Sequence, residues 1–158
     1  MSRGRDLVIA AASFAVAATA LVLGATQQWS GQATISGDPV SVGEWIYRTG
    51  TDPGGRPIPS SGGMMMRVGC AGCHGRDGRG LSTPMFRAPD ITYANLTDPK
   101  GMLEADGVRG PTFTDADIRR AVTQGIDPEG DTLAWHMPRW QFTDVEWRNL
   151  LAYLKTLR

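Results

Sequence analysis

The most apolar stretch of the chain is an uncharged run over residues 7–25. A helix rises about 1.5 Å per residue, so a run of this length comes close to spanning the roughly 30 Å apolar core of a bilayer. Arg3 and Arg5 precede the run, and basic residues on this side predict a cytoplasmic N-terminus with export of everything that follows. We therefore expect a transmembrane anchor, or uncleaved signal, over residues 1–25. The alternative is a cleaved signal peptide, because the run is rich in Ala.

Polar and flexible residues separate this run from a domain with helical patterning. Residues 26–40 carry no 3.6-residue periodicity and contain Gly, Ser, Thr and Pro, so we interpret them as a linker. The domain is expected over residues 41–158. Its first helix is predicted from Ser41, because Ser41 and Glu44 have the spacing of a capping box, and it is expected to end near Gly50.

Two later segments also carry helix start signals. Thr114 offers an N-cap with acidic residues in the turn that follows, and Gly125 is placed to end that helix in a left-handed conformation. Thr143 and Glu146 form a second capping-box pattern. Apolar residues then recur on one side of each helix, namely Ile118, Ala121 and Val122 in the first and Trp147, Leu150, Leu151 and Leu154 in the second. Each helix is therefore expected to pack one face on a core.

Composition and charge narrow the fold class and the partners. The chain contains 20 Gly and 10 Pro, many of them over residues 51–69 and 87–111, so long strands are not expected and these stretches bury little apolar surface. The 16 basic and 16 acidic residues cancel, which argues against a nucleic-acid partner, because phosphate neutralisation needs a basic surface. The pattern predicts a small all-α domain whose centre is filled by something other than these loops.

The two cysteines of the chain, Cys70 and Cys73, lie three residues apart, and His74 follows directly. This C-x-x-C-H motif is the attachment signature of c-type haem, because thiols at this spacing on one helical turn reach the two vinyl groups of the ring. A redox C-x-x-C is typical of a βαβ context, which the pattern of this chain lacks. A zinc site needs four ligands, but His136 is the only other histidine and there is no further cysteine. We expect one covalent haem c with His74 as the proximal iron ligand, and its burial would fill the apolar centre.

With this motif, the chain resembles the class I monohaem cytochromes c. The resemblance covers roughly residues 40–158 and rests on residues 70–75 (CAGCHG), on Met137 followed by Pro138, and on residues 147–157 (WRNLLAYLKTL). It implies the class I cytochrome c fold, a small helical domain wrapped around one haem, in which the N- and C-terminal helices cross. The residues that match the family's crossing positions are Gly43, Tyr47, Leu150 and Tyr153.

The resemblance also implies the second iron ligand. Met137 lies between two predicted helices and precedes a proline, as in the family, so it is the expected distal ligand; a thioether there stabilises ferrous iron and raises the potential. The alternatives are His136, Met85, Met102 and an open site. The methionines at 64–66 lie too close before the C-x-x-C-H motif to reach the far face. Soft thioethers bind Cu(I), but three consecutive residues do not easily converge on one ion, and a flexible apolar contact patch is the plainer interpretation.

Three further residues are assigned around the haem through the same resemblance. The carbonyl of Pro89 is expected to accept a hydrogen bond from His74, which would fix the imidazole ring. Trp140 and Arg139 are placed to contact the haem propionates through the indole N–H and the guanidinium, and the alternative for Arg139 is a solvated surface arginine. One departure from the family pattern is the length of segment 51–69, between the first helix and the motif.

These expectations define an electron-transfer protein and not an enzyme. We expect a one-electron carrier or an electron-transfer subunit of a respiratory chain, held in the cytoplasmic membrane by a single N-terminal helix, with its haem domain on the periplasmic side. Its expected partners are respiratory donor and acceptor proteins or a membrane oxidoreductase complex. The alternatives are a haem-based sensor with a displaceable sixth ligand and a peroxidase-like enzyme, for which His136 would be the available distal acid or base.

Overall fold

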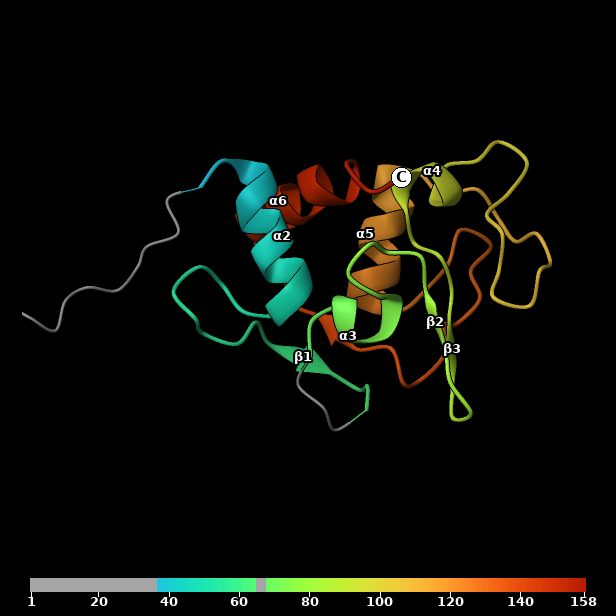
Figure 1. Ribbon diagram of the computed structural model, residues 1–158, viewed down its shortest axis with the longest axis horizontal. Coiled ribbons are helices and arrows are strands. Elements are labelled where there is room, and N and C mark those ends of the chain that lie inside the picture. Colours follow the sequence, from blue (N-terminus) through green and yellow to red (C-terminus); the bar gives the residue numbers. More distant parts are fainter. Residues whose placement is uncertain (1–36, 65–67) are drawn as a thin grey trace, which may run out of the picture. The chain divides into compact units, whose positions relative to one another are not determined.

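The computed structural model describes residues 37–64 and 68–158 of the chain. Its longer helices are α2 (Pro39–Thr49), α5 (Asp115–Gln124) and α6 (Asp144–Leu154), and the one-turn helices α3 (Ala71–His74) and α4 (Tyr93–Leu96) lie between α2 and α5 in the sequence. Helices α2 and α6 lie against each other (Figure 1). The buried apolar residues of the three longer helices form much of the core, namely Val42, Ile46, Tyr47, Ile118, Ala121, Trp147, Leu150, Tyr153 and Leu154.

The crossing of α2 and α6 depends on a glycine. A Cβ at Gly43 would lie 2.0 Å from the backbone oxygen of Asn149 and 2.8 Å from the Cβ of Tyr153, so only a residue without a side chain lets the two backbones come this close. Beside this contact the rings of Tyr47 and Tyr153 pack with their centroids 5.2 Å apart. The predicted crossing of the first and last helices at these positions is therefore confirmed.

Helix α2 begins earlier than predicted. Asp38 is its N-cap, because Oδ1 of Asp38 accepts from the backbone N–H groups of Val40 and Ser41 at 2.9 and 3.2 Å. Pro39 fills the first helical position, where its missing N–H leaves nothing unsatisfied. The predicted capping box from Ser41 to Glu44 is therefore wrong, and the helix takes its first residues from the segment interpreted as a linker. The hydroxyl of Ser41 donates to Asp38 Oδ2 at 2.7 Å instead of capping a turn of its own.

The start and stop signals of the two later helices are confirmed. Thr114 and Thr143 cap α5 and α6, and each forms a reciprocal capping box with the carboxylate three residues further on, that of Asp117 or Glu146. Gly125 ends α5 with a φ of 71°, the left-handed conformation that glycine adopts without strain. The predicted apolar faces are buried at Ile118, Ala121, Trp147, Leu150 and Leu154 and partly buried at Val122 and Leu151.

Four two-residue strands in the described residues form two small antiparallel sheets. Strand β1 (Ser60–Ser61) pairs with β4 (Arg139–Trp140), and β2 (Leu81–Ser82) pairs with β3 (Arg87–Ala88). The sequence does not predict these strands, because two residues are too few to carry an alternating pattern. The first sheet joins the long connection before the C-x-x-C-H motif to the residues that follow Met137.

The predicted membrane anchor lies outside the described residues, as do most of the predicted linker and Met65 and Met66. Within residues 37–64 and 68–158, no helix combines the length and the apolar character that crossing a membrane requires. The anchor and its orientation therefore stay predictions.

Candidate haem-binding cavity

The last four residues of the C-x-x-C-H motif form helix α3, and Cys70, the first residue of the motif, is its N-cap. The backbone N–H of His74 donates to the carbonyl of Cys70 at 2.9 Å, which closes one helical turn. Before this turn, Gly69 lies directly against the end of α2, where a Cβ would come within 2.4 Å of the carbonyl oxygen of Tyr47. The motif is therefore seated on the backbone of α2, and glycine at position 69 permits the contact.

Two tyrosine hydroxyls hold the backbone on the other side of the motif. Tyr47 donates to the carbonyl of Gly75 at 2.8 Å, and Tyr153 donates to the carbonyl of Arg76 at 3.3 Å. Burial raises the pKa of Tyr47 well above its usual range, so its hydroxyl remains a donor. The crossing of α2 and α6 thus positions both ends of α3.

A cavity of about 350 Å³ lies beside the motif. This volume is within the range of pockets that bind small molecules and cofactors. Much of its wall is apolar and comes from several elements, including Leu96, Met102, Phe113, Ile118, Ala121, Leu150 and Leu154. Cys70, Cys73, His74 and Met137 line the same cavity. The four residues expected to attach the ring and bind the iron are therefore brought together.

His74 is held in the form that binds a metal. It is 8% exposed, and its Nδ1 lies 2.9 Å from the carbonyl oxygen of Pro89. A carbonyl only accepts hydrogen bonds, so Nδ1 is assigned the proton and Nε2 keeps a lone pair for a metal. Burial lowers the pKa of His74, and the bond to Pro89 opposes this in part, so the ring is neutral near pH 7. The hydrogen bond to Pro89 is the one that the resemblance implies.

The two thiols lack the property that a redox pair requires. Burial raises the pKa of Cys70 to about 12 and also raises that of Cys73. A redox C-x-x-C depends on a lowered thiol pKa, because the thiolate is the nucleophile. The surroundings of the motif therefore do not favour a thiolate, which argues against a redox C-x-x-C.

Three of the candidate iron ligands on the distal side line the cavity, namely Met137, His136 and Met102, and so does Met64, which was not a candidate. Met85 is 78% exposed and is not among the lining residues, so it is removed as a candidate. Met102 is 3% exposed and packs in the apolar core, where its side chain already has a structural role. Met137 is half-buried and lies outside that core cluster, which leaves its thioether available to a ligand in the cavity.

The presence of Met64 at the cavity follows from the course of segment 51–69. Strand β1 pairs with β4, and the N–H of Gly63 donates to the carbonyl of Trp135 at 3.1 Å. Residues 60–63 of this segment therefore lie beside residues 135–140, the part of the chain that carries Met137. Met64 therefore lines the cavity, and the expectation that it cannot reach the far face of the iron stays a prediction. Met65 and Met66 are outside the described residues.

The guanidinium of Arg139 binds backbone carbonyls, and its expected contact with the haem propionates stays a prediction. Arg139 does not line the cavity, and it is not a solvated surface arginine, because its guanidinium donates to the carbonyls of Leu133, Ala134 and Met137. Trp140, by contrast, lines the cavity and is 7% exposed, with its ring stacked on Phe142. The sequence offered no signal for the contacts of Arg139, since they are made to backbone atoms.

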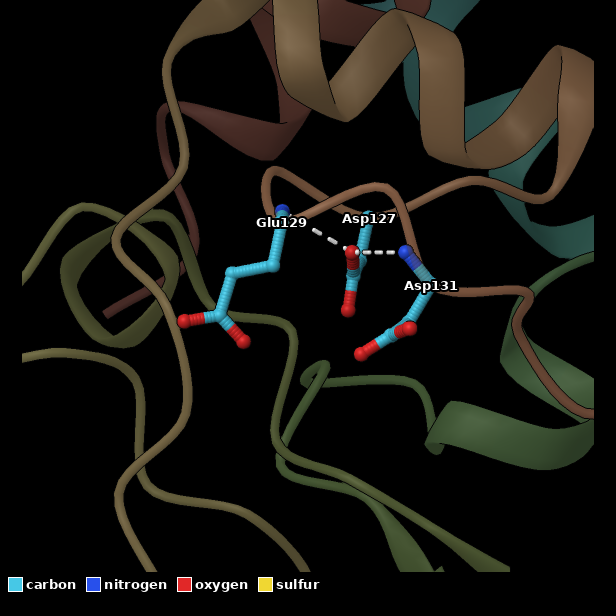
Figure 2. Close-up of side chains that lie close together, drawn as sticks. All are labelled: Asp127, Glu129 and Asp131. Carbon is cyan, nitrogen blue, oxygen red and sulfur yellow. Dashed lines mark hydrogen bonds between the residues drawn. The ribbon is translucent and has the colours of Figure 1, made fainter.

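A cluster of carboxylates that the sequence analysis did not single out lies in the loop after α5 (Figure 2). Oxygens of Asp127, Glu129 and Asp131 all lie within 4.8 Å of one another. Oδ1 of Asp127 accepts from the backbone N–H groups of Glu129 and Asp131 at 2.9 and 2.8 Å, so this side chain caps its own turn. Alternating acidic residues in a Gly-containing loop are the signal that identifies such a cluster. The turn accounts for Asp127, and we assign no metal here.

Comparison with known proteins gives no match: no family model, no curated protein and no solved structure matches the chain. The function of the cavity must therefore be inferred from its own residues. The apolar walls of the cavity enclose two protonated thiols, a neutral imidazole with a fixed tautomer, and a thioether. This set of groups fits a covalently attached haem.

Proposed function

We propose that this chain is a one-electron carrier, or an electron-transfer subunit of a respiratory chain, that holds a single covalent haem c. The observation that supports this most strongly is that Cys70, Cys73, His74 and Met137 line the same apolar cavity. The helix crossing at Gly43 and the hydrogen bond from His74 to Pro89 support the further proposal of a class I cytochrome c fold.

Each residue has a separate task in this proposal. The thiols of Cys70 and Cys73 would attach the ring. His74, kept neutral by burial and oriented by Pro89, would bind the iron through Nε2. The thioether of Met137 favours the ferrous state and so raises the reduction potential. The haem, when bound, supplies the exchange of one electron. The apolar walls limit the access of water, which also tunes the potential.

Partner proteins would approach an apolar rim beside the cavity. Trp135 is 75% exposed, and its ring centroid lies 5.9 Å from that of His136, which lines the cavity. The ring of Phe86 is also next to His136, at 5.8 Å. Because basic and acidic residues are balanced, steering by charge is weak and encounters would depend on this apolar contact. The partners we propose are respiratory donor and acceptor proteins or a membrane oxidoreductase complex, met at the outer face of the cytoplasmic membrane.

Spectroelectrochemical titration of the haem-loaded chain tests the proposal. We expect a reversible one-electron transition, a weak long-wavelength band typical of methionine-ligated ferric haem, and no binding of CO by the reduced protein. CO binding to the wild-type chain would favour the alternative, a sensor with a displaceable sixth ligand. Absence of a reversible one-electron transition would contradict the proposed carrier.

A further inference from the structure

Residues 133–138 form the loop that carries Met137, called here the loop of Met137. Three of its backbone carbonyls accept hydrogen bonds from one side chain, that of Arg139. Nη2 of Arg139 donates to the carbonyl of Leu133 at 2.7 Å, and Nη1 donates to the carbonyls of Met137 and Ala134. The guanidinium group is a planar fork with five N–H donors, so a single arginine can bind several acceptors in a fixed geometry. The loop is therefore organised around Arg139, and Met137 is itself one of the bonded residues.

The end of helix α5 is shaped to receive this guanidinium. A Cβ at Gly125 would lie 1.7 Å from Nε of Arg139 and 2.1 Å from its Cζ, so glycine is required there for space as well as for its φ of 71°. The carbonyl of Gly125 also accepts from the N–H of Leu133 at 2.8 Å. The helix end, the guanidinium and the start of the loop form one connected group.

The backbone of Arg139 is fixed independently of its side chain. Arg139 lies in β4 and is paired with Ser61 of β1. Next to this pair, Gly63 packs against Pro138, where a Cβ on the glycine would lie 2.8 Å from the Cγ of the proline. The guanidinium therefore projects from an anchored strand onto a loop whose other hydrogen bonds, those of Leu133, Trp135 and Met137, join backbone atoms to each other.

We propose that Arg139 is a positioning residue that keeps the loop of Met137 closed, so that the thioether of Met137 remains in the cavity. This inference rests on the proposed function, since it assigns Met137 a ligand to hold. It differs from a role of Arg139 as a charge near the haem: positioning requires the fork of donors, whereas an electrostatic role requires only a positive charge.

Competition with imidazole separates these roles. An external ligand binds the ferric protein only when the sulfur of Met137 has left, so the apparent affinity for imidazole measures how readily the loop opens. Two variants are made in the full haem-loaded chain. Arg139→Gln removes the planar set of guanidinium donors and the positive charge, whereas Arg139→Lys removes the planar set of donors and keeps the charge. We expect both variants to bind imidazole about tenfold more tightly than the wild type, or more, because each loses hydrogen bonds from a charged donor.

Arg109→Gln is the matched control. Arg109 also donates to a loop carbonyl, that of Gly101, and to Asp98 at 2.9 Å, but it does not contact the loop of Met137. We expect this variant to lose thermal stability while its imidazole affinity stays that of the wild type. A merely structural role of Arg139 would make its variants resemble this control.

Each outcome decides one point. Wild-type imidazole affinity in both Arg139 variants overturns the positioning role, and so does a wild-type affinity in Arg139→Lys alone, since charge then suffices. If Arg139→Gln fails to fold, the lysine variant decides by the same criterion. Absence of the long-wavelength band from the wild-type chain would instead refute ligation by Met137, and with it the proposed function, before any variant is compared.

Discussion

Replacing Gly43 with alanine tests the helix crossing on which the motif is seated. The new Cβ would lie 2.0 Å from the carbonyl oxygen of Asn149, 2.6 Å from its carbonyl carbon and 2.8 Å from the Cβ of Tyr153. Comfortable contacts between carbon atoms are about 3.5–4.0 Å, so α2 and α6 must move apart by about 1 Å or more. The higher helix propensity of alanine stabilises the folded state by about 1 kcal/mol relative to glycine. Overpacking destabilises it by about 1–3 kcal/mol, and by more where the obstacle is rigid backbone. We expect the free energy of unfolding to fall by about 2 kcal/mol.

Urea unfolding of the haem-loaded chain, followed by circular dichroism, measures this loss. Arg148→Ala is the control, because Arg148 is exposed on the same helix as Asn149 and its replacement is expected to change stability by less than about 0.5 kcal/mol. The reasoning would be refuted if Gly43→Ala unfolded at the same urea concentration as the wild type, because a Cβ would then fit between the two backbones.

Three further predictions concern the anchor, the distal ligand and a helix cap. The chain is expected to fractionate with membranes and to resist extraction by high salt, because apolar insertion of residues 7–25 is insensitive to screening; soluble material with an N-terminus near Thr26 would refute the anchor. Met137→Ala should abolish the long-wavelength band, lower the midpoint potential and let CO bind, and the assignment is wrong if the band persists in Met137→Ala but is lost in Met102→Ala. The hydroxyl of Thr114 holds the pKa of Asp117 below its ordinary 3.8, so the stabilisation by this carboxylate is complete above about pH 4 and is lost as the pH falls through the lowered pKa. The destabilisation caused by Asp117→Asn should therefore be smaller at pH 2 than at pH 7 in thermal unfolding, and an equal loss at both pH values would contradict this.

Helix boundaries could be predicted where one local signal was unopposed. Thr114 and Thr143 each precede a carboxylate at the right spacing and an apolar face, and both cap their helices as predicted. Ser41 begins the same pattern. Asp38, however, lies upstream, is followed by Pro39, and accepts from the first N–H groups of α2, so the helix begins before Ser41. Local patterns therefore identified the helices, and competition between neighbouring caps decided where α2 begins.

The candidate site was predictable in its proximal half and less so in its distal half. The spacing of Cys70, Cys73 and His74 is itself the signal, and all three line one cavity with Met137. The role of Arg139 depends on hydrogen bonds to backbone carbonyls, and the course of segment 51–69 depends on two-residue strands. Neither feature leaves a recognisable pattern of residue types in the sequence. Such contacts follow only from the tertiary structure.

Covalent attachment of haem to this chain can be measured as the intact mass of the full chain, exported by a host that attaches haem and then denatured in acid to remove unattached haem. We expect a mass increased by one haem, with the addition on a peptide that contains Cys70 and Cys73. A variant with both cysteines replaced by alanine should lack this mass and lose much of its helical circular dichroism, because the ring contributes buried apolar surface. A wild-type chain that releases all its haem on denaturation and retains two free thiols would contradict the account.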